Sequence, residues 1–148
     1  MIRVSSVEYL VYCHATEDCS KVLEAVKKLL PPDMRDTVVF KQQKLRGYYG
    51  NPITVISLKI VENAEKIFDY LISRINDIDK AIISSTIDLR YDSRLRKLYL
   101  RFDKQEAYRG NVVLQDSDDV IKIIISFSNH YSKLNSVKEY LRNKGFIR

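Results

Sequence analysis

The sequence predicts an α+β fold, with a single mostly antiparallel sheet and helices on one of its faces. Several segments alternate between apolar and polar residues, which is the period of half-buried strands, and others repeat apolar residues at helical spacing. Links of hairpin length join the strands, and the helices fall between runs of strands in the order β-α-β-β-α(α)-β-β-β-α. We therefore expect the whole chain, residues 1–148, to form one domain.

The first strand and helix are expected near the N-terminus. Residues 2–13 alternate and carry apolar side chains on both parities, as in a central strand or a strand whose second face is covered. Thr16 offers an N-cap for a helix over 17–30, and the prolines at 31 and 32 stop that helix.

A β-hairpin is expected next. Residues 37–44 begin with β-branched and aromatic side chains, and residues 53–61 alternate, so both segments are predicted strands. The segment 45–52 between them contains two glycines and an Asn-Pro pair, which are turn signals. The sequence therefore predicts a hairpin over 41–59 with an enlarged, tyrosine-bearing tip.

Two helices are expected in the middle of the chain. Asn63 offers the cap of a helix whose apolar positions run from Ile67 to Ile75. A shorter helix is expected to start at Asp77 or Asp79, although residues 84–89 also fit an extended segment.

The C-terminal half is expected to add three strands and a last helix. The strands are predicted at 97–103, 111–115 and 120–128, with a polar loop at 104–110 and an acidic turn at 116–119. Asn135 or Ser136 offers the cap of the last helix, and Gly145 ends it.

Composition narrows the class of protein. Hydrophobic residues make up 45% of the chain, and only four Gly and three Pro are present, so we expect a packed core rather than disorder. No apolar run approaches the roughly 20 residues of a membrane span, so we expect no membrane partner. The two cysteines, Cys13 and Cys19, form no disulfide framework, and a reducing cytoplasm is the simplest expectation.

Positive charge and aromatic rings are concentrated in residues 90–110. This stretch holds seven Lys or Arg against three acids, within a chain of formal charge +6. In the strand at 97–103, Tyr99 and Arg101 are predicted to alternate with core residues and to face away from them. Long cations can reach phosphates, and flat rings can stack on unpaired bases. The hairpin repeats the combination, and the alternative for both segments is an ordinary solvated surface.

Other candidate sites have simpler alternatives. The segment 47–52 could bind an anion through its glycines, but an ordinary hairpin tip is the better interpretation. The cluster Cys13, His14, Glu17, Asp18 and Cys19 lacks a second ligand pair for zinc, and the acidic turn lacks the pattern of a calcium loop. The sequence shows no nucleophile-base pair, so we expect neither catalysis nor a cofactor.

Three blocks of sequence, at 15–18, 47–53 and 98–108, resemble a small archaeal family described as RNA-binding and as a predicted subunit of the archaeal exosome. The resemblance runs over roughly residues 3–127. It implies a fold like that of the large-subunit ribosomal protein that contacts 5S rRNA. It also implies RNA association in the cytoplasm, as a homodimer or within a larger complex, and it implies no catalysis.

The candidate RNA contacts combine the resemblance with the charge pattern. Arg101, Lys104, Gln105 and Tyr108 match the third block, and Tyr49 and Asn51 match the second. The full set of candidates is Arg101, Lys104, Gln105, Tyr108, Arg109, Tyr99, Lys44, Arg46, Tyr49 and Asn51.

We expect a non-catalytic RNA-binding protein, acting as an accessory subunit of an archaeal exosome or another RNA-processing complex. The alternative is an assembly subunit, homodimeric or partner-bound, that does not contact RNA directly. In that case the apolar residues Leu10, Val55 and Ile124 beside the charges would form a protein interface. An enzyme acting on RNA ranks third, because the sequence offers no acid-base pair for it.

Overall fold

The computed structural model describes residues 2–47, 50–128 and 133–148. Among these residues, six strands form one sheet in the order β2-β3-β1-β6-β5-β4, and all neighbouring strands are antiparallel. This arrangement confirms the predicted α+β class. The strands are β1 (Val4–His14), β2 (Lys41–Arg46), β3 (Pro52–Ile60), β4 (Tyr91–Asp92), β5 (Lys97–Phe102) and β6 (Ile121–Phe127).

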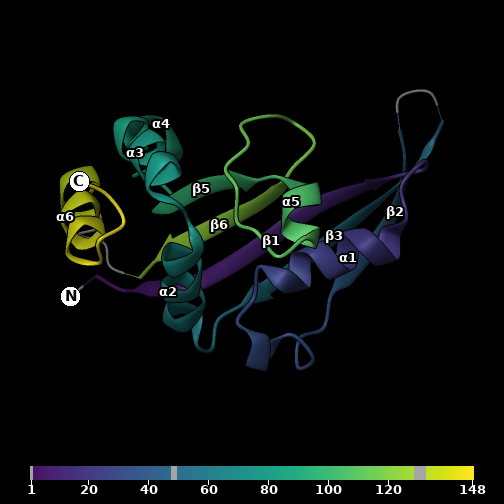
Figure 1. Cartoon of the computed structure of the whole chain (residues 1–148), viewed down its shortest axis with the longest axis horizontal. Helices are drawn as coiled ribbons and strands as arrows, with labels where there is room; N and C mark the ends of the chain where they lie inside the picture. Colours follow the sequence, from purple (N-terminus) through teal and green to yellow (C-terminus); the bar gives the residue numbers. More distant parts are fainter. Residues whose placement is uncertain (1, 48–49, 129–132) are drawn as a thin grey trace.

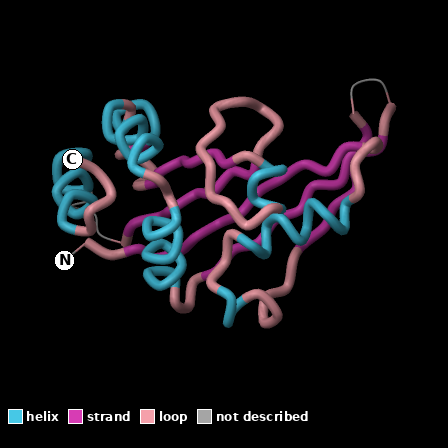
Figure 2. The backbone as a smooth tube through the Cα atoms, in the orientation of Figure 1, coloured by secondary structure: helices cyan, strands magenta, loops and turns pink. Residues whose placement is uncertain are grey.

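The helices gather on one side and at one end of the sheet. In Figures 1 and 2, α1, α2 and α5 lie in front of the sheet, whereas α3, α4 and α6 lie at the end where β1 begins. Their bounds are α1 (Cys19–Lys28), α2 (Ala64–Arg74), α3 (Asp77–Ser85), α4 (Ile87–Arg90), α5 (Lys104–Tyr108) and α6 (Leu134–Asn143), with a 3₁₀ turn η1 (Pro32–Met34). Within the described residues, no helix is both long and apolar enough to cross a membrane.

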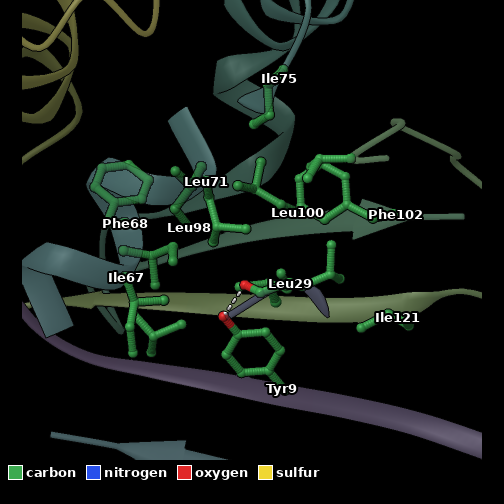
Figure 3. Packing of buried hydrophobic residues seen from close by; sticks show 14 of the residues in the cluster. Tyr9, Leu29, Ile67, Phe68, Leu71, Ile75, Leu98, Leu100, Phe102 and Ile121 are labelled. Carbon is green, nitrogen blue, oxygen red and sulfur yellow. Dashed lines mark hydrogen bonds between the residues drawn. The ribbon is translucent and has the colours of Figure 1, made fainter. Parts of the chain in front are cut away.

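The core lies between the sheet and the helices that cover it. Every second residue of β5 and β6 is buried, which is the period predicted for half-buried strands. The inward side chains of these strands, including Leu98, Leu100 and Ile121, pack with Phe68 and Leu71 of α2 (Figure 3). One face of the sheet therefore supplies most of the apolar area that folding removes from water.

Glu65, at the start of α2, joins the two ends of the chain. Its carboxylate accepts hydrogen bonds from the backbone N–H of Val4 at 2.7 Å and from the hydroxyl of Tyr140 at 2.8 Å. The ammonium of Lys144 donates a third, at 2.7 Å. These contacts hold β1 and the end of α6 against α2.

Several predicted boundaries are wrong for local reasons. The segment 104–110 is not a loop, because Asp103 accepts a hydrogen bond from the backbone N–H of Glu106 at 2.8 Å and caps helix α5. No strand forms at 111–115, where Val112 and Leu114 make only isolated bridges. The second strand starts at Lys41 rather than at 37.

The helix starts also differ from the prediction. Asp18, not Thr16, is the N-cap of α1, because its carboxylate accepts from the backbone N–H of Ser20. The last helix starts at Leu134, with Lys133 as its N-cap, so neither predicted cap residue holds that position. Asn63 does hold the N-cap position of α2, as predicted, but without a side-chain hydrogen bond.

Cys13 and Cys19 form a disulfide, with 5.7 Å between their Cα atoms. The expectation of two reduced cysteines is therefore wrong for this structure. The bond joins the end of β1 to the first residue of α1, so it closes the turn that carries His14 and Glu17.

Tyr9 provides a test of the core. It is 1% exposed, and its hydroxyl donates a hydrogen bond of 2.8 Å to the carbonyl of Leu29 at the end of α1 (Figure 3). Tyr9→Phe should lower the free energy of unfolding by about 1–2 kcal/mol, because the buried carbonyl loses its partner. Urea unfolding measures this.

Tyr12→Phe is the matched control, since the Tyr12 side chain is 39% exposed on the opposite face of the same strand. It should change stability by less than about 0.5 kcal/mol. Equal effects of the two substitutions would show that the Tyr9 hydrogen bond adds nothing to stability.

Candidate functional site

The face of the sheet that points away from α1 and α2 is here called the outer face. Directly paired residues of neighbouring strands lie on the same face, so the strand register defines it. One row across the sheet is Arg101–Lys122–Leu10–Ser57–Lys41, a second is Tyr99–Ile124–Glu8–Lys59, and a third is Tyr12–Val55–Gln43. All these residues are partly or fully exposed, and these rows hold four cations against one acid.

The outer face is hollowed where it meets α4 and the acidic turn. The hollow has a volume of about 400 Å³ and is lined by Thr86, Leu89, Arg90, Tyr99, Arg101, Asp116 and Lys122. It therefore brings two of the predicted contacts, Tyr99 and Arg101, together with residues from a distant part of the chain.

Arg90 and Asp116 form a fixed wall of this hollow. The guanidinium of Arg90 donates to both oxygens of Asp116, at 2.9 and 2.7 Å, and to the hydroxyl of Thr86 at 2.8 Å. The Arg90 hydrogen bond holds the pKa of Asp116 below its ordinary value, so the pair stays ionised at neutral pH. Arg90 is only 10% exposed in its side chain, and its charge is neutralised by Asp116.

The other cations of the hollow are less engaged. Arg101 donates one hydrogen bond of 3.2 Å to the carbonyl of Ser117, and its guanidinium is 4.0 Å from the exposed carboxylate of Asp118. Within the part of the chain that the structure describes, Lys122 has no ion pair and the Tyr99 hydroxyl has no hydrogen bond. Lys122 and the Tyr99 ring are thus presented to solvent beside Arg101, whose contacts within the protein are long.

Lys104 is placed differently from the other predicted contacts. Its side chain is 9% exposed, and its ammonium donates to the carbonyl of Tyr12 at 2.6 Å, to Glu17 at 3.1 Å and to Asp119 at 2.5 Å. Partial burial opposes ionisation of Asp119, but the hydrogen bonds and charges of Lys104 and His14 together outweigh it and lower the pKa of Asp119. The structure therefore gives Lys104 a role in holding the turn together.

The contacts of Lys104 also affect the two places where the sequence raised the question of a metal ion, the His14–Glu17 cluster and the acidic turn. His14, Glu17 and Asp119 lie close enough to share a metal ion, but the Lys104 ammonium already lies against both carboxylates and offsets part of their negative charge. The three acids of the turn at 116–119 do not converge on one point either. Each approaches a different cation: Asp116 is near Arg90, Asp118 near Arg101 and Asp119 near Lys104.

The remaining predicted contacts lie away from the hollow. Gln105, Tyr108 and Arg109 belong to the α5 segment, which packs against α1 on the covered side of the sheet. Arg109 pairs with Glu106 at 2.7 Å, and the carbonyl of Tyr108 accepts from Lys28 at 2.6 Å. These residues form a second group.

The hairpin residues form a third group. Lys44 pairs with Thr54 and Arg46 with Pro52, which places both cations on the side of α1. Asn51 is exposed at the hairpin tip, and Tyr49 lies outside the described residues. The predicted contacts therefore do not form one surface.

Three further residues that line the hollow were not among the predicted RNA contacts: Lys122, Arg90 and Leu89. Lys122 interrupts an apolar run, which is a signal that it faces away from the core. Its position beside Arg101 depends on the pairing of β5 with β6, which sequence periodicity does not provide.

Comparison with known proteins links the chain to one family. A family model described as RNA binding matches residues 6–127. An uncharacterized protein of Methanocaldococcus jannaschii is 34% identical over 145 residues, covering 95% of this chain and 97% of the relative. An RNA-binding protein of Pyrococcus abyssi is 31% identical over 144 residues, covering 95% and 93%.

Solved structures agree with this relationship. A crystal structure of a protein from Archaeoglobus fulgidus is 29% identical and superposes with a TM-score of 0.80, covering 96% of this chain and 99% of the other. A protein from Sulfolobus solfataricus is 28% identical, with a TM-score of 0.76 and coverage of 95% and 97%. Both are described as members of the family DUF54.

The internal role of Lys104 can be tested by Lys104→Gln. We expect the free energy of unfolding to fall by about 2 kcal/mol, below the 3–5 kcal/mol of fully buried pairs because Asp119 is 59% exposed. The loss should be greatest at neutral pH. The pKa of Asp119 is lower in the folded state, so its contribution is present above its ordinary pKa and disappears as the pH falls through the lowered value. Urea unfolding at several pH values measures both effects.

Lys21→Gln on α1 is the control, since Lys21 is exposed and has no ion pair within the described ranges. It should leave stability nearly unchanged. A similar small effect for Lys104→Gln at neutral pH would contradict the internal role.

Proposed function

This chain belongs to the family described as RNA binding, and from that premise we propose that it binds RNA through the outer face of its sheet. The observation that carries the proposal is the hollow beside Tyr99, where Lys122 has no ion pair within the described residues and Arg101 has only the exposed carboxylate of Asp118, at 4.0 Å, as an ionic partner. The phosphates of RNA carry the negative charge that would neutralise this positive surface.

The physical chemistry of RNA favours this face over the other one. A cation that is already paired within the protein has less to offer a phosphate, and this applies to the nearly buried Lys104 and more weakly to Arg109, whose pair with Glu106 is exposed. On the same side of the sheet Lys44 and Arg46 have no ion pair within the described residues, but they lie on the hairpin, away from an accessible hollow with a tyrosine ring. A sheet surface with an accessible aromatic ring also matches a common way of holding unpaired bases. Tyr99 and the half-exposed Tyr12 both belong to the outer face.

We propose a binding role without catalysis, in the cytoplasm, as an accessory subunit of an archaeal exosome or another RNA-processing complex. The support for a non-catalytic role is the state of the acids around the hollow. Asp116 has both oxygens bound to Arg90, so it is poorly placed to accept a proton from a nucleophile.

An assembly role is a second candidate, because the outer face is not purely polar. Leu10, Val55 and Ile124 are half-buried there among the charges, and mixed surfaces of this kind occur in protein interfaces. In this case a homodimer would cover the outer face. Light scattering helps to distinguish the candidates, since a stable monomer that binds RNA would count against the homodimer.

The phosphate contacts can be tested with Arg101→Ala combined with Lys122→Gln. We expect weaker binding to many RNA sequences, and a smaller dependence of affinity on salt. The slope of log affinity against log salt should fall by about 0.7 for each lost contact to single-stranded RNA. Fluorescence anisotropy with a labelled RNA, between about 50 and 200 mM salt, measures both quantities.

Lys44→Gln is the control, because Lys44 is an exposed lysine on the other side of the sheet. Its effect should be much smaller than that of the double variant. If Lys44→Gln weakens binding more than the double variant does, the outer face is not the RNA surface.

A further inference from the structure

The hollow on the outer face has the size of a small-ligand site rather than a flat docking surface. Its volume of about 400 Å³ lies within the range of roughly 300–1,000 Å³ that such sites occupy. Its walls come from α4, β5, β6 and the acidic turn, and they combine apolar and charged side chains. Resting on the proposed function, we propose that this hollow holds one unpaired nucleotide, so that the protein selects single-stranded or looped RNA over duplex RNA.

Tyr99 and Leu89 provide the apolar walls for the base. The ring of Tyr99 projects from β5 on the outer face, and Leu89 on α4 is 88% exposed although it is a large aliphatic residue. Both line the same hollow. Every nucleobase has a flat π face, so stacking on Tyr99 tolerates any sequence, and Leu89 supplies a second apolar surface for the base.

Arg101 and Lys122 provide the charge for the phosphate. They are directly paired across β5 and β6, and residues in that relation have Cβ atoms about 4.5–5.5 Å apart. Two cations so close together favour an anion between them. Asp116 does not oppose this, because Arg90 binds both of its oxygens and neutralises its charge. Asp118 lies 4.0 Å from the Arg101 guanidinium, but its carboxylate is fully exposed, so solvent screens its charge.

The concave shape explains why the nucleotide must be unpaired. In an A-form duplex the bases are stacked inside the helix, and only phosphates, sugars and groove edges reach a protein surface. A duplex could contact Arg101 and Lys122 but could not place a base face against Tyr99 inside the hollow. A base in a loop, a bulge or a single strand can turn outward into it.

Two substitutions of Tyr99 test this inference. Tyr99→Leu keeps an apolar side chain but removes the ring, and Tyr99→Phe keeps the ring. With a labelled oligouridylate, Tyr99→Leu should weaken binding about tenfold, which is the loss expected for one stacked base, whereas Tyr99→Phe should bind nearly as the unmodified protein does. With a duplex of the same length, the unmodified protein should bind less tightly than it binds the oligouridylate, and neither substitution should change that affinity.

Tyr108→Leu is the matched control, because Tyr108 is a 42% exposed tyrosine on α5, away from the hollow. It should not change oligouridylate binding. Unchanged oligouridylate binding by Tyr99→Leu, or equal losses for single strand and duplex, would overturn the nucleotide site while RNA binding itself stands. Absence of binding to both RNAs at low salt would overturn the proposed function as well.

Discussion

The structure depends on the burial of only one face of its sheet. An antiparallel sheet can leave a face in water if its other face and the helices packed on it bury enough apolar area. Leu98 and Leu100 of β5 and Ile121 and Ile123 of β6 are all fully buried on that face. Because side chains alternate along a strand, this burial turns Tyr99, Arg101 and Lys122 outward. The outer face therefore follows from the core.

Two lysines show how burial decides what a charge does. Lys104 is nearly buried and bonds to β1, to the turn between β1 and α1 and to the turn before β6, so its charge is used inside the fold. Lys122 has no ion pair within the described residues and lies beside Arg101 on the outer face. A count of positive charges along the sequence treats these residues alike. Only the fold separates a cation that stabilises a turn from one that is available to a phosphate.

Periodicity predicted the parts of the fold whose burial is regular. The alternation in β5 and β6 and the helical spacing in α2 each define one buried face, and these elements lie close to where they were expected. The failures are short or irregular segments. Helix α5 has only five residues, so its N-cap residue Asp103 was its main signal in the sequence. For the candidate site, alternation placed Tyr99 and Arg101 on the outer face. Alternation could not predict that Lys122, Arg90 and Leu89 lie beside these two residues, because that depends on strand register and on the packing of α4.

The most direct test of the central claim is an NMR titration of the isotope-labelled protein with an unpaired oligoribonucleotide. If the outer face binds RNA, the backbone amide signals that shift should belong to β5, β6 and α4 around the hollow. Shifts confined to α1 and α5, on the covered side of the sheet, would contradict the account.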